Sequence, residues 1–65
     1  MYMAIIYGWQ TVTAFSENKE KAKRLAVNAK KASCRDDLTR WTWASCAEYY
    51  GARVTEIREG DIITD

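Results

Sequence analysis

The sequence contains no histidine, which removes the side chain that most often acts as a general base. It also removes imidazole as a metal ligand and excludes both a Ser/His/Asp triad and a Cys/His dyad. The only adjacent carboxylates are Asp36 and Asp37. Neighbouring side chains on a helix point about 100° apart, so we interpret this pair as a helix cap and a first-turn charge. We therefore expect a protein that is not an enzyme, with no catalytic residue, no metal site and no cofactor.

Proline is also absent, and glycine occurs only three times, so few positions mark a turn. Cys34 and Cys46 form no Cys-x-x-Cys motif, and their spacing does not indicate a disulfide. No apolar run approaches the ~18 residues that a membrane span requires, and the N-terminus lacks the basic start and cleavage site of a secretory signal. These features predict a reduced, cytoplasmic protein that makes no membrane contact.

Charge is nearly balanced, with a formal net charge of +1, so the molecule has no overall field that would attract nucleic acid. The 65 residues are expected to form one domain, residues 1–65. Area scaling implies that a chain of this size buries only about 60% of its unfolded surface. Such a small core gains stability from association, so size alone favours an oligomer.

Residues 2–15 have the composition of a β-strand, being rich in Ile, Tyr, Trp, Val and Thr. Both alternating faces are apolar as far as Trp9, which predicts a central strand or a strand covered by a partner. Gly8 fits either a bulge in one long strand or the pivot of a tight hairpin. We favour one long, kinked strand, because Tyr-Gly-Trp-Gln is a poor two-residue turn.

A basic helix is predicted at residues 17–32, with Ser16 as its N-cap. Its expected buried stripe, at spacings of three and four, is Ala22, Leu25, Ala26, Ala29 and Ala32. The candidate residues for binding a phosphate or a partner are Lys19, Lys23, Arg24, Lys30 and Lys31. A solvated helix face is the simpler interpretation, because no aromatic residue is interleaved with these cations as a base-stacking groove requires.

Residues 36–51 predict an aromatic helix with an aspartate N-cap, and with Gly51 in the left-handed conformation after its last turn. Cys46 is expected to be a small buried hydrophobe. The expected core-facing stripe is Leu38, Trp41, Thr42, Ser45 and Tyr49. Trp43 and Tyr50 fall on the opposite side of the helical wheel. A partner is therefore expected to cover that outer face.

The remaining residues predict a strand at 52–57, a turn at 58–61 and a short edge strand at 62–64. The predicted fold class is α+β, in the order β-α-α-β-β. It consists of a small single-layer antiparallel sheet packed on an antiparallel helix pair.

Two classes of function fit these patterns. The first is a non-catalytic protein-binding module, a self-associating regulator or inhibitor of a larger protein or nucleoprotein partner, acting as a homodimer or higher oligomer. Tryptophan and tyrosine are enriched at interfaces, and the aromatic contact residues would be Trp9, Trp43, Ala47 and Tyr50. Residues 12–22 resemble the strand–cap–helix start common in short phage and mobile-element proteins, and an inhibitor of host machinery is one form of this first hypothesis. The alternative is a nucleic-acid-binding protein that uses the basic face of helix 17–32.

Overall fold

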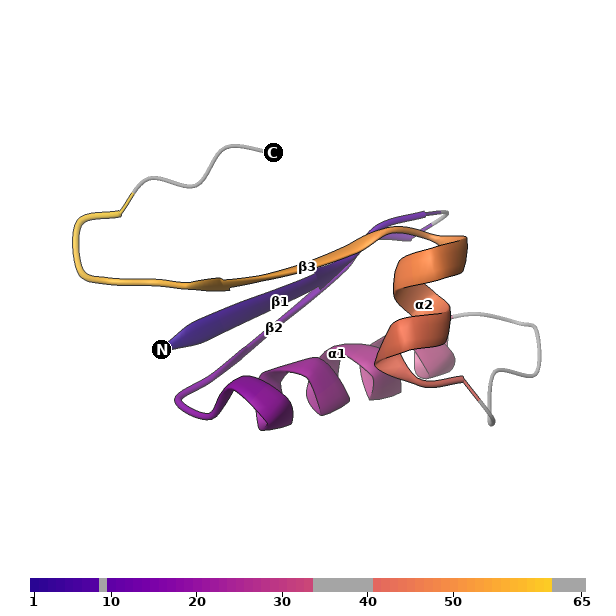
Figure 1. The fold of residues 1–65 in the computed structure, drawn as a ribbon, viewed down its shortest axis with the longest axis horizontal. Helices are drawn as coiled ribbons and strands as arrows, with labels where there is room; N and C mark the ends of the chain where they lie inside the picture. The colour runs from indigo at the N-terminus through magenta and orange to yellow at the C-terminus, as the bar shows by residue number, and fades with distance from the viewer. Residues whose placement is uncertain (9, 34–40, 62–65) are drawn as a thin grey trace.

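The computed structural model describes residues 1–8, 10–33 and 41–61. Its elements in chain order are β1 (Tyr2–Ile6), β2 (Val12–Ser16), α1 (Lys19–Ser33), α2 (Trp43–Tyr49) and β3 (Ala52–Glu56). The strands form one antiparallel sheet in the order β2-β1-β3. Both helices lie on the same side of this sheet (Figure 1). The predicted α+β class with an antiparallel sheet is confirmed.

The N-terminal segment is a β-hairpin, so the prediction of one kinked strand over residues 2–15 was wrong. β1 pairs with β2 in an unbroken register from Tyr2 opposite Ser16 to Ile6 opposite Val12. Residues 7–11 connect the two strands, so the connection is longer than the two-residue turn on which the prediction was based. The described elements therefore follow the order β-β-α-α-β. The predicted strand at 62–64 lies outside the described residues.

β1 is the central strand and is buried on both faces, as its two-sided apolar pattern predicted. Ala4 and Ile6 are fully buried in the core that the sheet shares with the helices. Met3 and Ile5 alternate with them onto the opposite face, where they are only 6% and 4% exposed. The core is therefore centred on β1.

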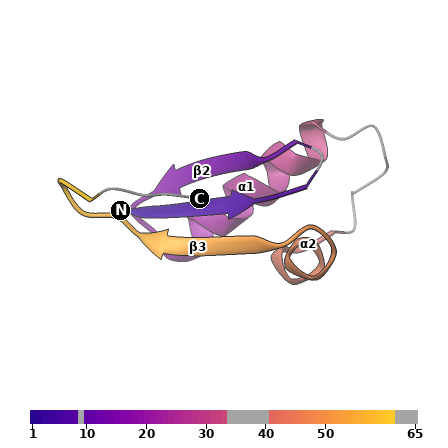
Figure 2. The same ribbon diagram turned by 90° about the horizontal axis from the view of Figure 1, so that it is seen from above.

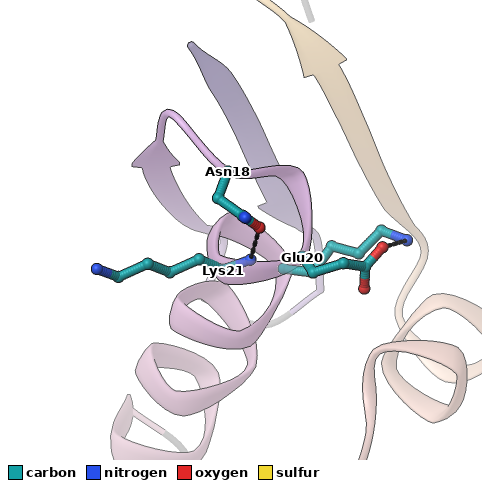
Figure 3. Close-up of polar contacts among 4 residues, drawn as sticks. Asn18, Glu20 and Lys21 are labelled. Atoms are coloured by element: carbon teal, nitrogen blue, oxygen red, sulfur yellow. Dashed lines mark hydrogen bonds and ion pairs between the residues drawn. The ribbon is translucent and has the colours of Figure 1, made fainter.

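The N-cap of α1 is Asn18 rather than the predicted Ser16. The side-chain Oδ1 of Asn18 accepts a hydrogen bond from the backbone N–H of Lys21 at 3.0 Å (Figure 3). Ser16 is the last residue of β2, and its Oγ accepts from the N–H of Asn18 at 3.2 Å. Since β2 extends through Ser16, the first residue able to cap the helix comes two positions later.

The buried face of α1 is rotated from the predicted one. The buried residues are Ala22, Ala26, Val27 and Lys30. Leu25 is 40% exposed, and Ala29 and Ala32 are also exposed. The prediction excluded lysine from the core on polarity alone. The structure buries a lysine instead, and this turns three predicted core residues outward.

α2 stands across the end of α1 rather than antiparallel to it (Figures 1 and 2). Its N-cap is Thr42, whose Oγ1 accepts from the N–H of Ser45 at 3.3 Å. The predicted aspartate caps at 36 and 37 lie outside the described residues. At the other end Gly51 has φ +86°, and its N–H donates to the carbonyl of Ala47 at 3.1 Å. The prediction of a left-handed glycine after the last turn is confirmed.

The core-facing side of α2 is opposite to the predicted side. Cys46 is fully buried, as expected of a small hydrophobe, and Trp43 and Tyr50 pack against the same core. Tyr49, predicted to face the core, is 73% exposed. Residues 43, 46, 47 and 50 have the spacing of a single helix stripe. The predicted helix face was wrong because the prediction began the helix several residues too early and so chose the face from residues that lie before α2. Among these residues, Trp41 does pack against the core, as predicted.

Substitution of Gly8 tests how closely the hairpin connection packs against α2. A Cβ at Gly8 would lie 2.3 Å from Cδ1 of Tyr50, and Gly8 has φ +109°. Gly8→Ala must therefore strain the backbone and displace the tyrosine ring. We expect the free energy of unfolding, measured in urea, to fall by about 2–4 kcal/mol.

Gly51→Ala is the matched control. Gly51 has φ +86°, but the nearest atom to its added Cβ is Cδ2 of Tyr7, at 3.7 Å. Only the backbone cost remains, so we expect a loss of about 1 kcal/mol. Equal losses in the two variants would contradict the close contact between Gly8 and Tyr50.

Candidate binding groove

A groove of ≈ 670 Å³ lies between α1 and the residues at the start of α2. The α1 wall consists of Glu20, Lys23, Arg24, Val27, Asn28 and Lys31. The opposite wall consists of Trp41, Thr42, Trp43 and Ala44. The groove thus combines three cations and two indole rings that come from separate parts of the sequence.

Helical periodicity explains why α1 presents these residues together. Ala22 and Ala26 face the sheet. The groove residues of α1 lie about a quarter turn or more away from these alanines around the helix, on the side that faces α2. Glu20, Arg24 and Lys31 repeat at spacings of four and seven on this flank. Val27 is 6% exposed and lies between the flank and the core. The polar wall of the groove therefore rests directly on buried apolar packing.

Lys23 connects the two walls of the groove. Its Nζ lies 3.5 Å from Oε1 of Glu20, the residue labelled in Figure 3. The same Nζ lies 5.8 Å from the centroid of the Trp43 ring. The carboxylate side chain of this ion pair is 81% exposed, so the pair contributes at most about 1 kcal/mol. A cation–π contact of this kind at a surface contributes about 0.5–1 kcal/mol. Lys23 is held weakly, and an anionic ligand can compete for its ammonium.

Trp41 is held in place by the rings of Tyr49 and Tyr50, with which it forms a cluster of three aromatic rings. Its ring centroid lies 5.2 Å from that of Tyr49 at an interplanar angle of 85°, and 5.5 Å from that of Tyr50 at 37°. Tyr49 and Tyr50 contact each other edge to face at 4.8 Å. These contacts orient Trp41 although it lies before the first turn of α2. They also give the exposed Tyr49 a packing role.

Lys30 is not part of the groove, although it was predicted to belong to the basic binding face. Its side chain is fully buried, its Nζ donates a hydrogen bond to the carbonyl of Gln10, and it lies 4.3 Å from the centroid of the Tyr50 ring. The ammonium thereby links α1 to the hairpin connection and to the end of α2. It is not accessible to a phosphate.

Only some of the other predicted site residues lie in the groove. Lys23, Arg24, Lys31 and Trp43 line the groove, whereas Lys19 is exposed outside its lining. Ala47 is half-buried on α2, Tyr50 packs against the core, and Trp9 lies outside the described residues.

Trp41 was predicted only as a core-facing residue, and it does pack against the core, but its place in the groove lining was not predicted. Trp41 is half-buried and lines the groove from a position before α2. The sequence feature that could have predicted this position is Thr42, a good N-cap residue directly between two tryptophans. Starting the helix there places Trp41 outside it.

In the part of the chain that the structure describes, no three His, Cys, Asp or Glu residues are grouped so that they could hold a metal ion. Within the same residues, no helix combines the length and apolar character that a membrane span needs. Comparison of the chain with protein-family models, with curated proteins and with solved structures found no match. The groove is therefore interpreted from its own chemistry.

Truncation of Lys30 tests whether this residue is structural. Lys30→Ala removes a buried stem, a hydrogen bond and a cation–π contact, so we expect the free energy of unfolding in urea to fall by about 2–4 kcal/mol. Lys19→Ala removes the same side chain from an exposed position of the same helix. That control should change stability by no more than about 0.5 kcal/mol. If the two variants unfold alike, Lys30 does not hold the fold together.

Proposed function

We propose that this protein is a non-catalytic module that binds single-stranded nucleic acid in the groove between α1 and residues 41–43. The observation that supports this proposal is the placement of Lys23, Arg24 and Lys31 around the rings of Trp41 and Trp43. A single strand offers phosphates to the cations and unpaired base faces to the indoles. The aromatic residues that α1 itself lacks are supplied by Trp41, which precedes α2, and by Trp43, the first residue of α2.

The charge distribution supports an anionic ligand at this groove. The whole chain has a net charge of only +1, but three cations and a single carboxylate line the groove. Screening at physiological salt limits charge effects to about 8 Å, so these local charges matter more than the total. Lys19 adds a further positive charge on the exposed part of α1.

The two indole rings favour a single strand over a duplex. Base faces in a duplex are stacked on one another and are not available to a side chain. Stacking of a base on an aromatic side chain contributes about 1–3 kcal/mol and depends little on the identity of the base. We therefore propose binding with weak sequence preference, in which the phosphates set the salt dependence.

The second candidate function is a protein-binding regulator or inhibitor of a larger protein or nucleoprotein partner, of the kind encoded by phage and mobile elements. Tyr49 is 73% exposed and Phe15 is 54% exposed, on different parts of the surface. Large aromatic side chains of this kind are common energetic centres of protein interfaces. An acidic peptide is the form of protein ligand that would also suit the groove.

Removal of one groove cation gives a quantitative test. The probe is a labelled single-stranded oligonucleotide of about ten nucleotides, and binding is followed by fluorescence polarisation at several salt concentrations. Arg24→Gln should weaken binding and lower the slope of log affinity against log salt by about 0.7. Arg58→Gln removes the same charge from an exposed residue outside the groove and should leave that slope unchanged.

Substitution of Trp41 tests the stacking contribution separately. Trp41→Leu should weaken binding by about 5- to 150-fold at fixed salt, with an unchanged salt slope and a native circular dichroism spectrum. Absence of binding by the unsubstituted protein at low salt would rule out the proposed function. Binding of a labelled acidic peptide, weakened by Arg24→Gln, together with no binding of the oligonucleotide, would favour the protein-binding candidate instead.

A further inference from the structure

The outer edge of β2 exposes backbone hydrogen-bonding groups. Two hydrogen bonds at the ends of the β1–β3 pair show which backbone groups of β1 point to β3. The N–H of Ile57 donates to the carbonyl of Met1 at 2.7 Å, and the N–H of Tyr7 donates to the carbonyl of Gly51 at 2.9 Å. The backbone N–H and C=O groups of odd-numbered β1 residues therefore point to β3, and those of even-numbered β1 residues point to β2. In the register of the hairpin, Thr13 and Phe15 then direct their N–H and C=O groups away from β1. No strand among the described residues pairs with this edge.

This edge carries none of the features that usually prevent strands from pairing. β2 is Val-Thr-Ala-Phe-Ser, with no charge and no proline, and its pairing with β1 contains no bulge. The other edge strand, β3, carries Arg53 and Glu56. One edge of the sheet is therefore charged and the other is neutral, so strand addition is favoured at β2.

The flank of α1 on the same side of the molecule is apolar apart from the exposed Lys21 in its first turn, whose side chain points away from Glu20 and from α2 (Figure 3). Leu25, Ala29 and Ala32 are exposed and follow one another at spacings of four and three. The groove flank of α1 faces α2, which lies on the β3 side of the sheet (Figure 2). The flank with Leu25 is on the opposite side of the helix and so lies beside β2.

We propose that β2 pairs antiparallel with β2 of a second copy, so that one continuous sheet spans both molecules. With Thr13 opposite Phe15 of the other copy, both outward-facing residues of each strand exchange their hydrogen bonds. No like charges meet along this edge. The ring of Phe15, 54% exposed, gains a cross-strand neighbour.

The dimensions of the fold allow the two helices to pack in such a dimer. α1 lies mainly against β2 and β1, and neighbouring strands are about 4.8 Å apart. Two copies of α1 beneath a continuous sheet would then lie about 10 Å apart, which is within the usual range for packed helices. The alanines at 29 and 32 leave room for this approach. The partner is therefore a second copy of this chain, and the groove stays open on the far flank of α1.

Sedimentation of the protein over the micromolar range tests the proposal. The protein should shift from 7.5 kDa towards twice that mass as its concentration rises. Thr13→Lys places a charge on the exposed β2 edge and should weaken the dimer at least about tenfold. The matched control is Thr55→Lys, which adds the same charge to the same sheet face on β3 and should leave the dimer intact.

Protection of backbone amides supplies an independent readout. In the dimer, the amides of Thr13 and Phe15 should exchange with solvent more slowly at high than at low protein concentration. A 7.5 kDa species at every concentration overturns the proposal. So does a dimer that Thr55→Lys weakens as much as Thr13→Lys. Either result leaves binding in the groove untouched, so the two proposals can fail separately.

Discussion

The buried ammonium of Lys30 connects three segments that are far apart in the sequence. It donates to the carbonyl of Gln10 in the hairpin connection and lies over the ring of Tyr50 at the end of α2. A buried cation without such partners would be costly, so the position of each segment depends on the others. Tyr50 in turn packs against Gly8, where even a Cβ would not fit. The orientation of α2, and with it one wall of the groove, follows from this contact.

The placement of Lys30 also determines how α1 uses the rest of its surface. With Lys30 and the small residues Ala22 and Ala26 directed inward, the flank towards α2 carries the groove cations. The opposite flank presents Leu25 and the exposed alanines beside β2. A helix rotated as the apolar pattern predicted would have buried Leu25 and exposed Lys30. Its polar residues would then no longer surround the tryptophans.

Features that depend on local sequence were predicted correctly. The apolar run in β1, the left-handed Gly51 and the buried Cys46 each follow from a residue type and its immediate neighbours. The buried faces of both helices were predicted wrongly, because each face was chosen by polarity alone and from an assumed first residue of the helix. Burial of Lys30 depends on a carbonyl twenty positions away. The orientation of α2 depends on an N-cap at Thr42. The sequence pattern favoured an aspartate, at 36 or 37, as the N-cap instead.

The groove could not be predicted for the same reason. Its cations and its indoles are separated in the sequence, and along α1 alone the lysines have no aromatic neighbours. Only when α2 stands across the end of α1 do the two sets meet (Figure 1). The aromatic residues between positions 41 and 50 then have two different roles. Tyr50 and Tyr49 pack and orient the structure, and this packing is what leaves the ring of Trp41 at the groove, where a ligand can reach it.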